Sequence, residues 1–146
     1  MFIPNQETAV TATNNGMILV WDRSLIIEGL GEQNEKRLVK IVFLNTSNYQ
    51  PINILQTVHD EYLVCGNSDG TIRFYDFGFK LVAWFEDLNF TTVKSISFSK
   101  TEPRAANNNY DQEDAEKMYD FKCSDFLVTD ENALMCMLNS TIFEEI

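Results

Sequence analysis

Few residues in this sequence have the types and spacing that catalysis requires. His59 is the single imidazole, and no serine or cysteine stands in a recognisable nucleophile motif beside it. Gly29-Leu30-Gly31 lacks both a third glycine and the strand-to-helix setting of a dinucleotide site. The three cysteines are too far apart in sequence to form a paired zinc motif. We therefore predict that the protein is not an enzyme, holds no cofactor or metal, and uses His59 structurally.

A cluster of carboxylates offers the other possible chemistry, because hard cations such as calcium bind several carboxylate oxygens together. Its members are Asp111, Glu113, Asp114 and Glu116. The run lacks the glycine and the regularly spaced Asp or Asn residues of a helix-loop-helix calcium loop. We favour a solvated acidic loop, and a calcium-responsive module is the alternative of a different class.

Composition narrows the class of partner. The chain has 146 residues, 45% of them hydrophobic, which is enough for one globular domain with its own core. Its formal charge of −11 predicts no binding to nucleic acid or to an anionic membrane surface, since both would repel it.

The sequence has no apolar run of the roughly 18 residues that a membrane span needs, and its first ten residues lack the basic side chains of a secretory signal. Cys65, Cys123 and Cys136 are an odd number without paired spacing, which predicts free thiols in a reducing, cytosolic or cytoskeletal compartment.

A strand, a tight turn and a second strand follow one another in two stretches, residues 9–22 and 62–76. The Asn-Gly and Asp-Gly pairs at their centres accept the positive φ angles of tight turns, so each stretch is expected to form a β-hairpin. Gly16 and Gly70 lie 54 positions apart, and self-similarity at such a spacing predicts a repeat architecture. The residues that define the turn and the strand end in the two copies are Gly16, Trp21, Asp22, Asp69, Gly70, Tyr75 and Asp76.

Further strands complete this repeat. A third, weaker hairpin is predicted over residues 126–138, with Asn132 in the place of the turn glycine. The remaining predicted strands are residues 37–43, 51–58, 81–86 and 93–99. Residues 51–86 would then form one up-and-down sheet of four strands, which is the outline of a propeller blade.

The aromatic side chains of these strands are expected to pack between sheets, and this group contains Phe74, Trp84, Phe85 and Phe98. Ile72 and Phe74 alternate with Arg73 and Tyr75, which predicts one buried face and one more polar face for this strand. Phe77 and Phe79 flank a turn glycine and are candidates for an exposed contact patch; a local aromatic cover over the sheet edge is the alternative.

The stretch "SDGTIRFYD" at residues 68–76 resembles the core of a WD40 repeat, in which an Asp-Gly turn and an alternating strand lead to Trp-Asp. Asp69-Gly70 and Tyr75-Asp76 match this pattern, whereas Asn15 replaces the turn aspartate in the first copy. The Gly-His dipeptide common in the family is absent from the sequence. The resemblance implies an all-β fold, an incomplete WD40 β-propeller of about two to three four-stranded blades. Its blade-like units would be residues 1–50, 51–92 and 93–146.

Three segments together resemble one blade of the large WD-repeat proteins of motile cilia that belong to the calmodulin- and spoke-associated complex. They are "EYLVCGNSDGTIRFYD" (61–76), "KLVAWFEDL" (80–88) and "VKSISFSKT" (93–101). The resemblance implies a non-catalytic scaffold of the axoneme, at the base of a radial spoke on the doublet microtubule, that supports control of dynein-driven motility. The implied partners are other axonemal proteins, namely radial-spoke and complex subunits, with calmodulin only indirectly. A general cytosolic WD-repeat adaptor is the alternative.

Two polar stretches are the candidate contact elements, the loop at 28–36 and an acidic, Asn-rich insertion at 100–122. Their acidity predicts basic partner surfaces and an association that weakens with salt. An idle solvated loop is the alternative for the insertion. Since a propeller closes with about 4 to 8 blades, we also expect another chain or chain segment to complete the sheet stack.

Overall fold

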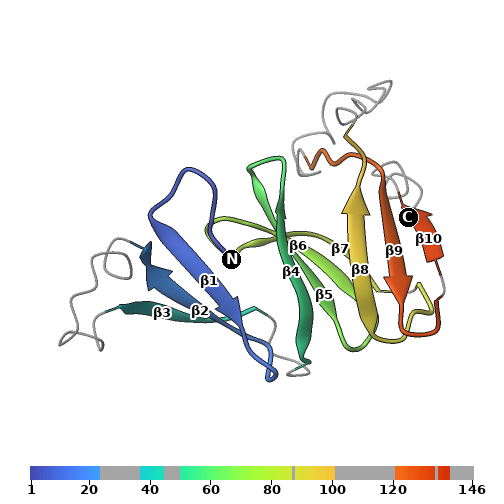
Figure 1. The fold of residues 1–146 in the computed structure, drawn as a ribbon, viewed down its shortest axis with the longest axis horizontal. Helices are drawn as coiled ribbons and strands as arrows, with labels where there is room; N and C mark the ends of the chain where they lie inside the picture. The colour runs from blue at the N-terminus through green and yellow to red at the C-terminus, as the bar shows by residue number, and fades with distance from the viewer. Residues whose placement is uncertain (24–36, 45–49, 87, 101–120, 134, 139–146) are drawn as a thin grey trace, which may run out of the picture.

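The residues that the structure describes form a nearly all-β fold, as the sequence predicts, with three antiparallel sheets placed one after another (Figure 1). The computed structural model describes residues 1–23, 37–44, 50–86, 88–100, 121–133 and 135–138. This succession of sheets is consistent with an incomplete propeller. Among the described residues, no helix has the length and apolar character needed to cross a bilayer.

The middle sheet contains four strands in chain order, and each strand pairs with the next. It consists of β4 (Ile52–Val58), β5 (Tyr62–Asn67), β6 (Ile72–Asp76) and β7 (Leu81–Phe85). The first sheet consists of β1 (Thr8–Ala12), β2 (Met17–Asp22) and β3 (Leu38–Phe43). The third consists of β8 (Val93–Phe98), β9 (Phe126–Asp130) and β10 (Met135–Leu138). All of the strands expected from the sequence are therefore confirmed, within one or two residues at their ends.

The first sheet continues beyond β1 through the start of the chain. Phe2 pairs with Ala9 in an antiparallel bridge, and the Ile3 N–H donates to the Thr8 carbonyl over 2.9 Å. The Ile3 side chain is 2% exposed and packs in the core between the first and middle sheets. Residues 1–3 thus occupy the edge position next to β1 that β4 occupies next to β5.

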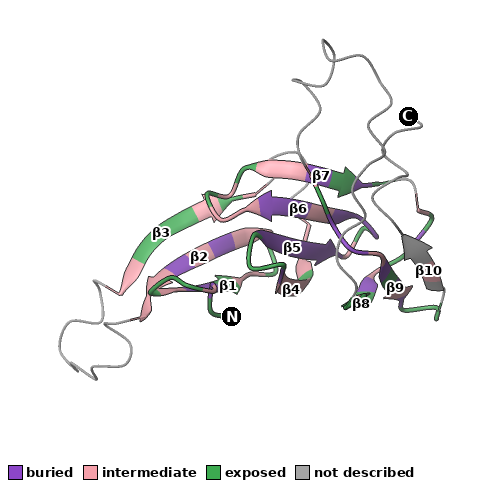
Figure 2. Cartoon of the chain, turned by 90° about the horizontal axis from the view of Figure 1, so that it is seen from above, coloured by how far each residue is buried: buried purple, intermediate pink, exposed green. Residues whose placement is uncertain are grey.

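The middle sheet is buried on both faces, so the prediction of one polar face for β6 is wrong. Ile72 and Phe74 lie in a cluster with Phe126 of the third sheet, whereas Tyr75 lies in a second cluster with Ile18 of the first sheet. Figure 2 shows β5 as buried along its length and β6 as mostly buried. Two covering sheets explain the difference, because alternation predicts a polar face only where that face meets water.

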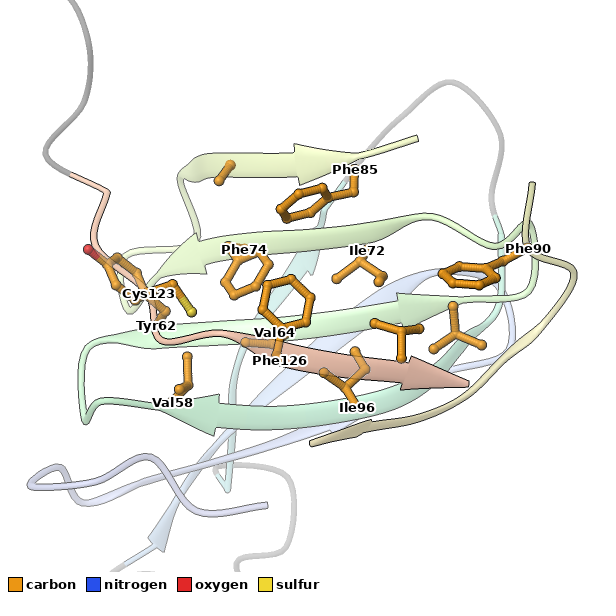
Figure 3. Packing of buried hydrophobic residues seen from close by; sticks show 13 residues of the cluster. Val58, Tyr62, Val64, Ile72, Phe74, Phe85, Phe90, Ile96, Cys123 and Phe126 are labelled. Atoms are coloured by element: carbon orange, nitrogen blue, oxygen red, sulfur yellow. The ribbon is translucent and has the colours of Figure 1, made fainter. Parts of the chain in front are cut away.

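Aromatic rings fill the space between the middle and third sheets (Figure 3). The Phe74 ring lies 5.6 Å from that of Phe126 and 6.2 Å from that of Phe85, both edge to face. Such pairs contribute about 0.5–1.5 kcal/mol each beyond their buried area. Phe98 packs against the same cluster. Trp84 does not: its side chain is 50% exposed on the outer strand β7, so the expectation that it packs between sheets is wrong.

β-Bulges recur at matching places in successive sheets. The first strand of the middle sheet and that of the third sheet each carry one extra residue at their start, Asn53 in β4 and Lys94 in β8. The bulge at Lys94 changes the alternation of β8, so Val93 and Ile96 both reach the core although they are three residues apart. The outer strands β3 and β7 carry a second matching pair, at Val39 and Val82. The repeat is therefore visible in irregularities as well as in strands.

Candidate interaction surface

The hairpin between β5 and β6 turns at Gly70, which no larger residue could replace without strain. Gly70 has a φ of 81°, and a Cβ atom at this position would lie 2.2 Å from the carbonyl oxygen of Phe90. The Oδ1 atom of Asp69 accepts the Thr71 N–H over 3.1 Å and the Thr71 hydroxyl over 2.7 Å. The Asp-Gly pair therefore closes the turn and lets the β7–β8 connection pass directly over it.

The other two hairpins turn in the same way, which locates the repeat in the structure. The N–H groups of Gly16, Gly70 and Ala133 each donate to the carbonyl three residues earlier, over 3.2 Å, and all three residues have positive φ. The residue at the glycine position of the third hairpin is therefore Ala133, with φ 60°, and the expectation of Asn132 is wrong by one residue. Local sequence favours Asn over Ala at positive φ, so the register had to be decided by tertiary contacts.

Those contacts involve Asp130, a carboxylate that is 4% exposed and that no sequence motif marks as a functional residue. Its Oδ2 atom accepts the N–H and the hydroxyl of Thr91, each over 3.0 Å, and its Oδ1 atom accepts the Asn132 N–H over 3.0 Å. Thr91 lies in the connection that leaves the middle sheet, so Asp130 links two sheets. A buried carboxylate with three donors is strongly held, and removing it would leave those donors unpaired.

A second set of hydrogen bonds continues this link toward β4. The Thr92 hydroxyl donates to the Ser68 carbonyl over 3.3 Å, and the Ser68 N–H donates to the Pro51 carbonyl over 3.0 Å. The Asn53 amide donates to the Ser68 hydroxyl over 3.2 Å. The hairpin ends of the middle and third sheets are therefore joined by one connected set of hydrogen bonds.

The opposite end of the sheets carries the aromatic-Asp residues of the repeat. The Oδ1 atom of Asp76 accepts the N–H groups of Gly78 and Lys80, each over 2.9 Å, and so closes the β6–β7 turn. In the first sheet the Trp21 indole donates to the Thr11 hydroxyl over 3.0 Å, and the Asp22 N–H donates to the Arg37 carbonyl. These residues hold turns and neighbouring strands together.

Phe77 and Phe79 lie at this end and are half-buried. Both pack against the cluster that contains Tyr75, and the Lys40 ammonium lies 5.8 Å from the centre of the Phe79 ring. The Tyr75 hydroxyl donates to the Leu44 carbonyl over 3.2 Å, which joins the middle sheet to the first. This position favours an aromatic cover over the gap between the two sheets; a contact patch stays a prediction for the exposed parts of the rings.

The predicted contact loops start and end at the same kind of position in their sheets. The chain leaves β2 after Asp22 and re-enters the first sheet at Leu38, and it leaves β8 after Phe98 and re-enters the third sheet at Phe126. Both connections therefore lie at the strand ends opposite the hairpin turns. The loop at 28–36, most of the insertion at 100–122 and the carboxylates Asp111, Glu113, Asp114 and Glu116 lie outside the described residues.

His59 holds the stem of the insertion in place. It lies in the β4–β5 turn, where His59 and Asp60 have φ angles of 57° and 51°, and its Nε2 atom accepts the Ser124 N–H over 3.1 Å. Ser124 is 2% exposed and lies two residues before the start of β9. The single imidazole thus has a structural hydrogen bond, in agreement with the role expected from the sequence.

The buried thiols of Cys65 and Cys123 are unsuited to nucleophilic chemistry. Burial raises the pKa of both Cys65 and Cys123 to about 12, so each is protonated at neutral pH. Cys65, Cys123 and Cys136 are not joined in disulfide bonds. Within the part of the chain that the structure describes, no group of three or more His, Cys, Asp or Glu residues could hold a metal ion.

Comparison with known proteins finds similarity along the whole chain. No family model matches it. The chain is 41% identical over 160 aligned residues to cilia- and flagella-associated protein 251 of Tetrahymena thermophila, covering 100% of this chain and 16% of that protein. It is 35% identical over 147 residues to the protein of the same name from Chlamydomonas reinhardtii, covering 99% of this chain and 17% of that protein. The mouse protein of this name is 30% identical over 64% of the chain. The chain thus spans about one sixth of the length of the first two relatives.

Proposed function

We propose that this chain, whose homologues are the cilia- and flagella-associated 251 proteins, is a non-catalytic structural scaffold of the motile cilium axoneme. Its position would be the base of a radial spoke on the doublet microtubule, where it supports control of dynein-driven motility. The observation that carries this proposal is the similarity to ciliary and flagellar proteins over the entire chain, at 41% and 35% identity.

The fold that we propose for the assembled protein is a WD40 propeller, with blade units at residues 1–50, 51–92 and 93–146. Three features support it: sheets that cover one another in sequence order, bulges that recur from sheet to sheet, and the same turn geometry in all three hairpins. A closed propeller needs about 4 to 8 blades. Further sheets must therefore come from other chain segments, as the greater length of the relatives allows.

The partners that we propose are other axonemal proteins, including subunits of the radial spoke and of the calmodulin- and spoke-associated complex. The loop at 28–36 and the insertion at 100–122 are the proposed contacts, because each connects strand ends that lie opposite the hairpin turns of its sheet. A chain with a formal charge of −11 favours basic partner surfaces and disfavours nucleic acid and anionic membranes.

An axonemal fractionation tests this function. The chain would carry an epitope tag in its own motile cells, and isolated axonemes would be cross-linked and analysed by mass spectrometry. We expect the tagged chain in the axonemal fraction, cross-linked to subunits at the spoke base. Recovery only in the soluble cell-body fraction would overturn the proposal. A variant that lacks residues 100–122 serves as the internal comparison, because unchanged assembly would remove the insertion from the contact surface.

A further inference from the structure

Trp84 is a large apolar side chain that the middle sheet leaves in water. It is 50% exposed on β7, the last strand of that sheet. The first and third sheets each pack against one described sheet, whereas the middle sheet packs against both. A further sheet in the assembled protein would therefore leave Trp84 exposed. It could cover the other exposed large hydrophobic side chains of the described residues, which are Met1, Phe2, Val39, Ile41, Phe43 and Leu127.

Two charged side chains lie beside Trp84. Arg73 of β6 pairs directly opposite it, and Glu86 follows it by two positions, so all three side chains are on the same side of the sheet. Ala83 and Phe85 point to the other side, into the core shared with the third sheet. The Arg73 Nη2 atom lies 3.7 Å from the Glu86 Oε1 atom. We call this group of indole, guanidinium and carboxylate the outer-edge site.

The outer-edge site presents its negative charge to solvent. The Arg73 side chain is 12% exposed, whereas the Glu86 side chain is 51% exposed. Their separation of 3.7 Å exceeds hydrogen-bond distance, so the Glu86 carboxylate keeps its capacity to accept hydrogen bonds. A partner that approaches this edge therefore meets an indole and a carboxylate, with the cation mostly buried behind them.

The backbone of β7 is poorly suited to the addition of a partner strand. The pairing with β6 shifts at Val82, and β7 ends soon afterwards at Phe85. A bulge in an edge strand hinders pairing with another chain, because it interrupts the regular row of backbone donors and acceptors. Recognition at this edge is therefore expected to depend on side chains.

We propose that the outer-edge site binds an arginine side chain of a partner protein, with its guanidinium stacked on the Trp84 indole and paired with Glu86. The face of an indole attracts a cation, and the planar guanidinium can stack on a ring while it donates to a carboxylate. The inference rests on the proposed function, since the partner would be another axonemal protein. It adds a contact on a sheet edge to those proposed for the loop at 28–36 and the insertion at 100–122.

The charge of the whole chain favours a basic partner segment over a second copy. At a formal charge of −11, two copies repel each other, whereas an arginine-bearing segment is attracted. The Trp84 indole N–H offers a further donor to a backbone carbonyl of that segment. Within the described part of the chain this N–H has no hydrogen-bond partner, whereas the Trp21 indole donates to the Thr11 hydroxyl over 3.0 Å.

NMR titration of the purified 146-residue chain with a blocked tetra-arginine peptide tests the site. The chain has two tryptophans, so the Trp21 indole N–H resonance is an internal control. We expect the Trp84 indole resonance to shift and that of Trp21 to stay in place. A tetra-citrulline peptide has the same planar groups without the charge and should shift neither resonance.

Variants separate the two proposed contacts. Glu86→Gln should weaken binding of the tetra-arginine peptide about two- to fivefold, as the loss of an exposed ion pair predicts. Trp84→Leu should weaken it by a similar factor, measured from the Glu86 amide resonance. Glu61→Gln removes the same charge at the opposite end of the middle sheet and should leave the dissociation constant unchanged. Retained dispersion of the amide resonances confirms that each variant is folded.

Three results of the titration would overturn the inference. They are a Trp84 shift no larger than that of Trp21, an equal response to the citrulline peptide, or equal effects of Glu86→Gln and Glu61→Gln. A photo-reactive amino acid at position 84 of the tagged chain identifies the partner in cells. We expect a cross-link beside an arginine of a different axonemal protein, and a cross-link to another copy of this chain would also overturn the inference. Because the titration uses purified protein, its failure is distinguishable from failure of the axonemal localisation.

Discussion

Replacing Gly70 with alanine should destabilise the hairpin at the centre of the molecule. The residue has a φ of 81°, which costs a non-glycine residue about 1–2 kcal/mol. A Cβ atom would also lie 2.2 Å from the Phe90 carbonyl oxygen and 2.8 Å from the Thr91 carbonyl oxygen. Both atoms belong to the backbone, so the β7–β8 connection would have to move, and overpacking of this kind costs about 1–3 kcal/mol. We expect a total loss of about 3 kcal/mol in the free energy of unfolding.

Urea unfolding followed by circular dichroism measures this loss, and hydrogen exchange of residues 62–76 tests whether it is centred on the hairpin. Gly70→Asn separates the two causes, because asparagine tolerates positive φ better than alanine but brings the same Cβ atom. We expect Gly70→Asn to be nearly as destabilising as Gly70→Ala. If asparagine recovers most of the lost stability, the close approach of the Phe90 backbone is not the main cause and the reasoning is refuted.

Three further predictions concern the third hairpin and the buried ionisable groups. Ala133→Gly should raise the free energy of unfolding by about 1 kcal/mol, because alanine is held at φ 60°; urea unfolding that shows no gain would contradict this. Asp130→Ala should lower the free energy of unfolding by about 3 kcal/mol, because it leaves the donors of Thr91 unpaired. Asp130→Asn keeps one acceptor oxygen and should lower it by less. Equal losses in the two variants, measured by urea unfolding, would show that packing and not hydrogen bonding dominates. Stability should fall as pH rises from 9 toward 12, because burial raises the pKa of Cys65 and Cys123 from 9.0 to about 12 and the unfolded thiols release their protons first. Thermal unfolding across this pH range measures the slope, and Cys65→Ala should reduce it; an unchanged slope would mean that other groups cause it.

Local signals predicted much of the fold correctly. The Asn-Gly and Asp-Gly turns and the alternating strands depend on backbone preferences within a few residues, and the structure confirms the corresponding strands. The structural role of His59 was also predictable, since a lone imidazole had no catalytic partner in the sequence. The side chains of Ile41 and Phe43 are two residues apart in β3 and lie on one face of the first sheet, where they are 48% and 57% exposed.

The chain by itself therefore determined the order of strands and the places of two turns, because those depend on local backbone energies. Tertiary structure decided the rest. Packing between two sheets buried Tyr75 on the face expected to be polar, and the same stacking left Trp84 at the rim, half exposed. The link between Asp130 and Thr91, 39 residues apart, accompanies an alanine at positive φ that local preference would not choose. Such contacts join residues that are distant in sequence. They stabilise the fold only once the sheets are stacked, so local sequence preferences do not predict them.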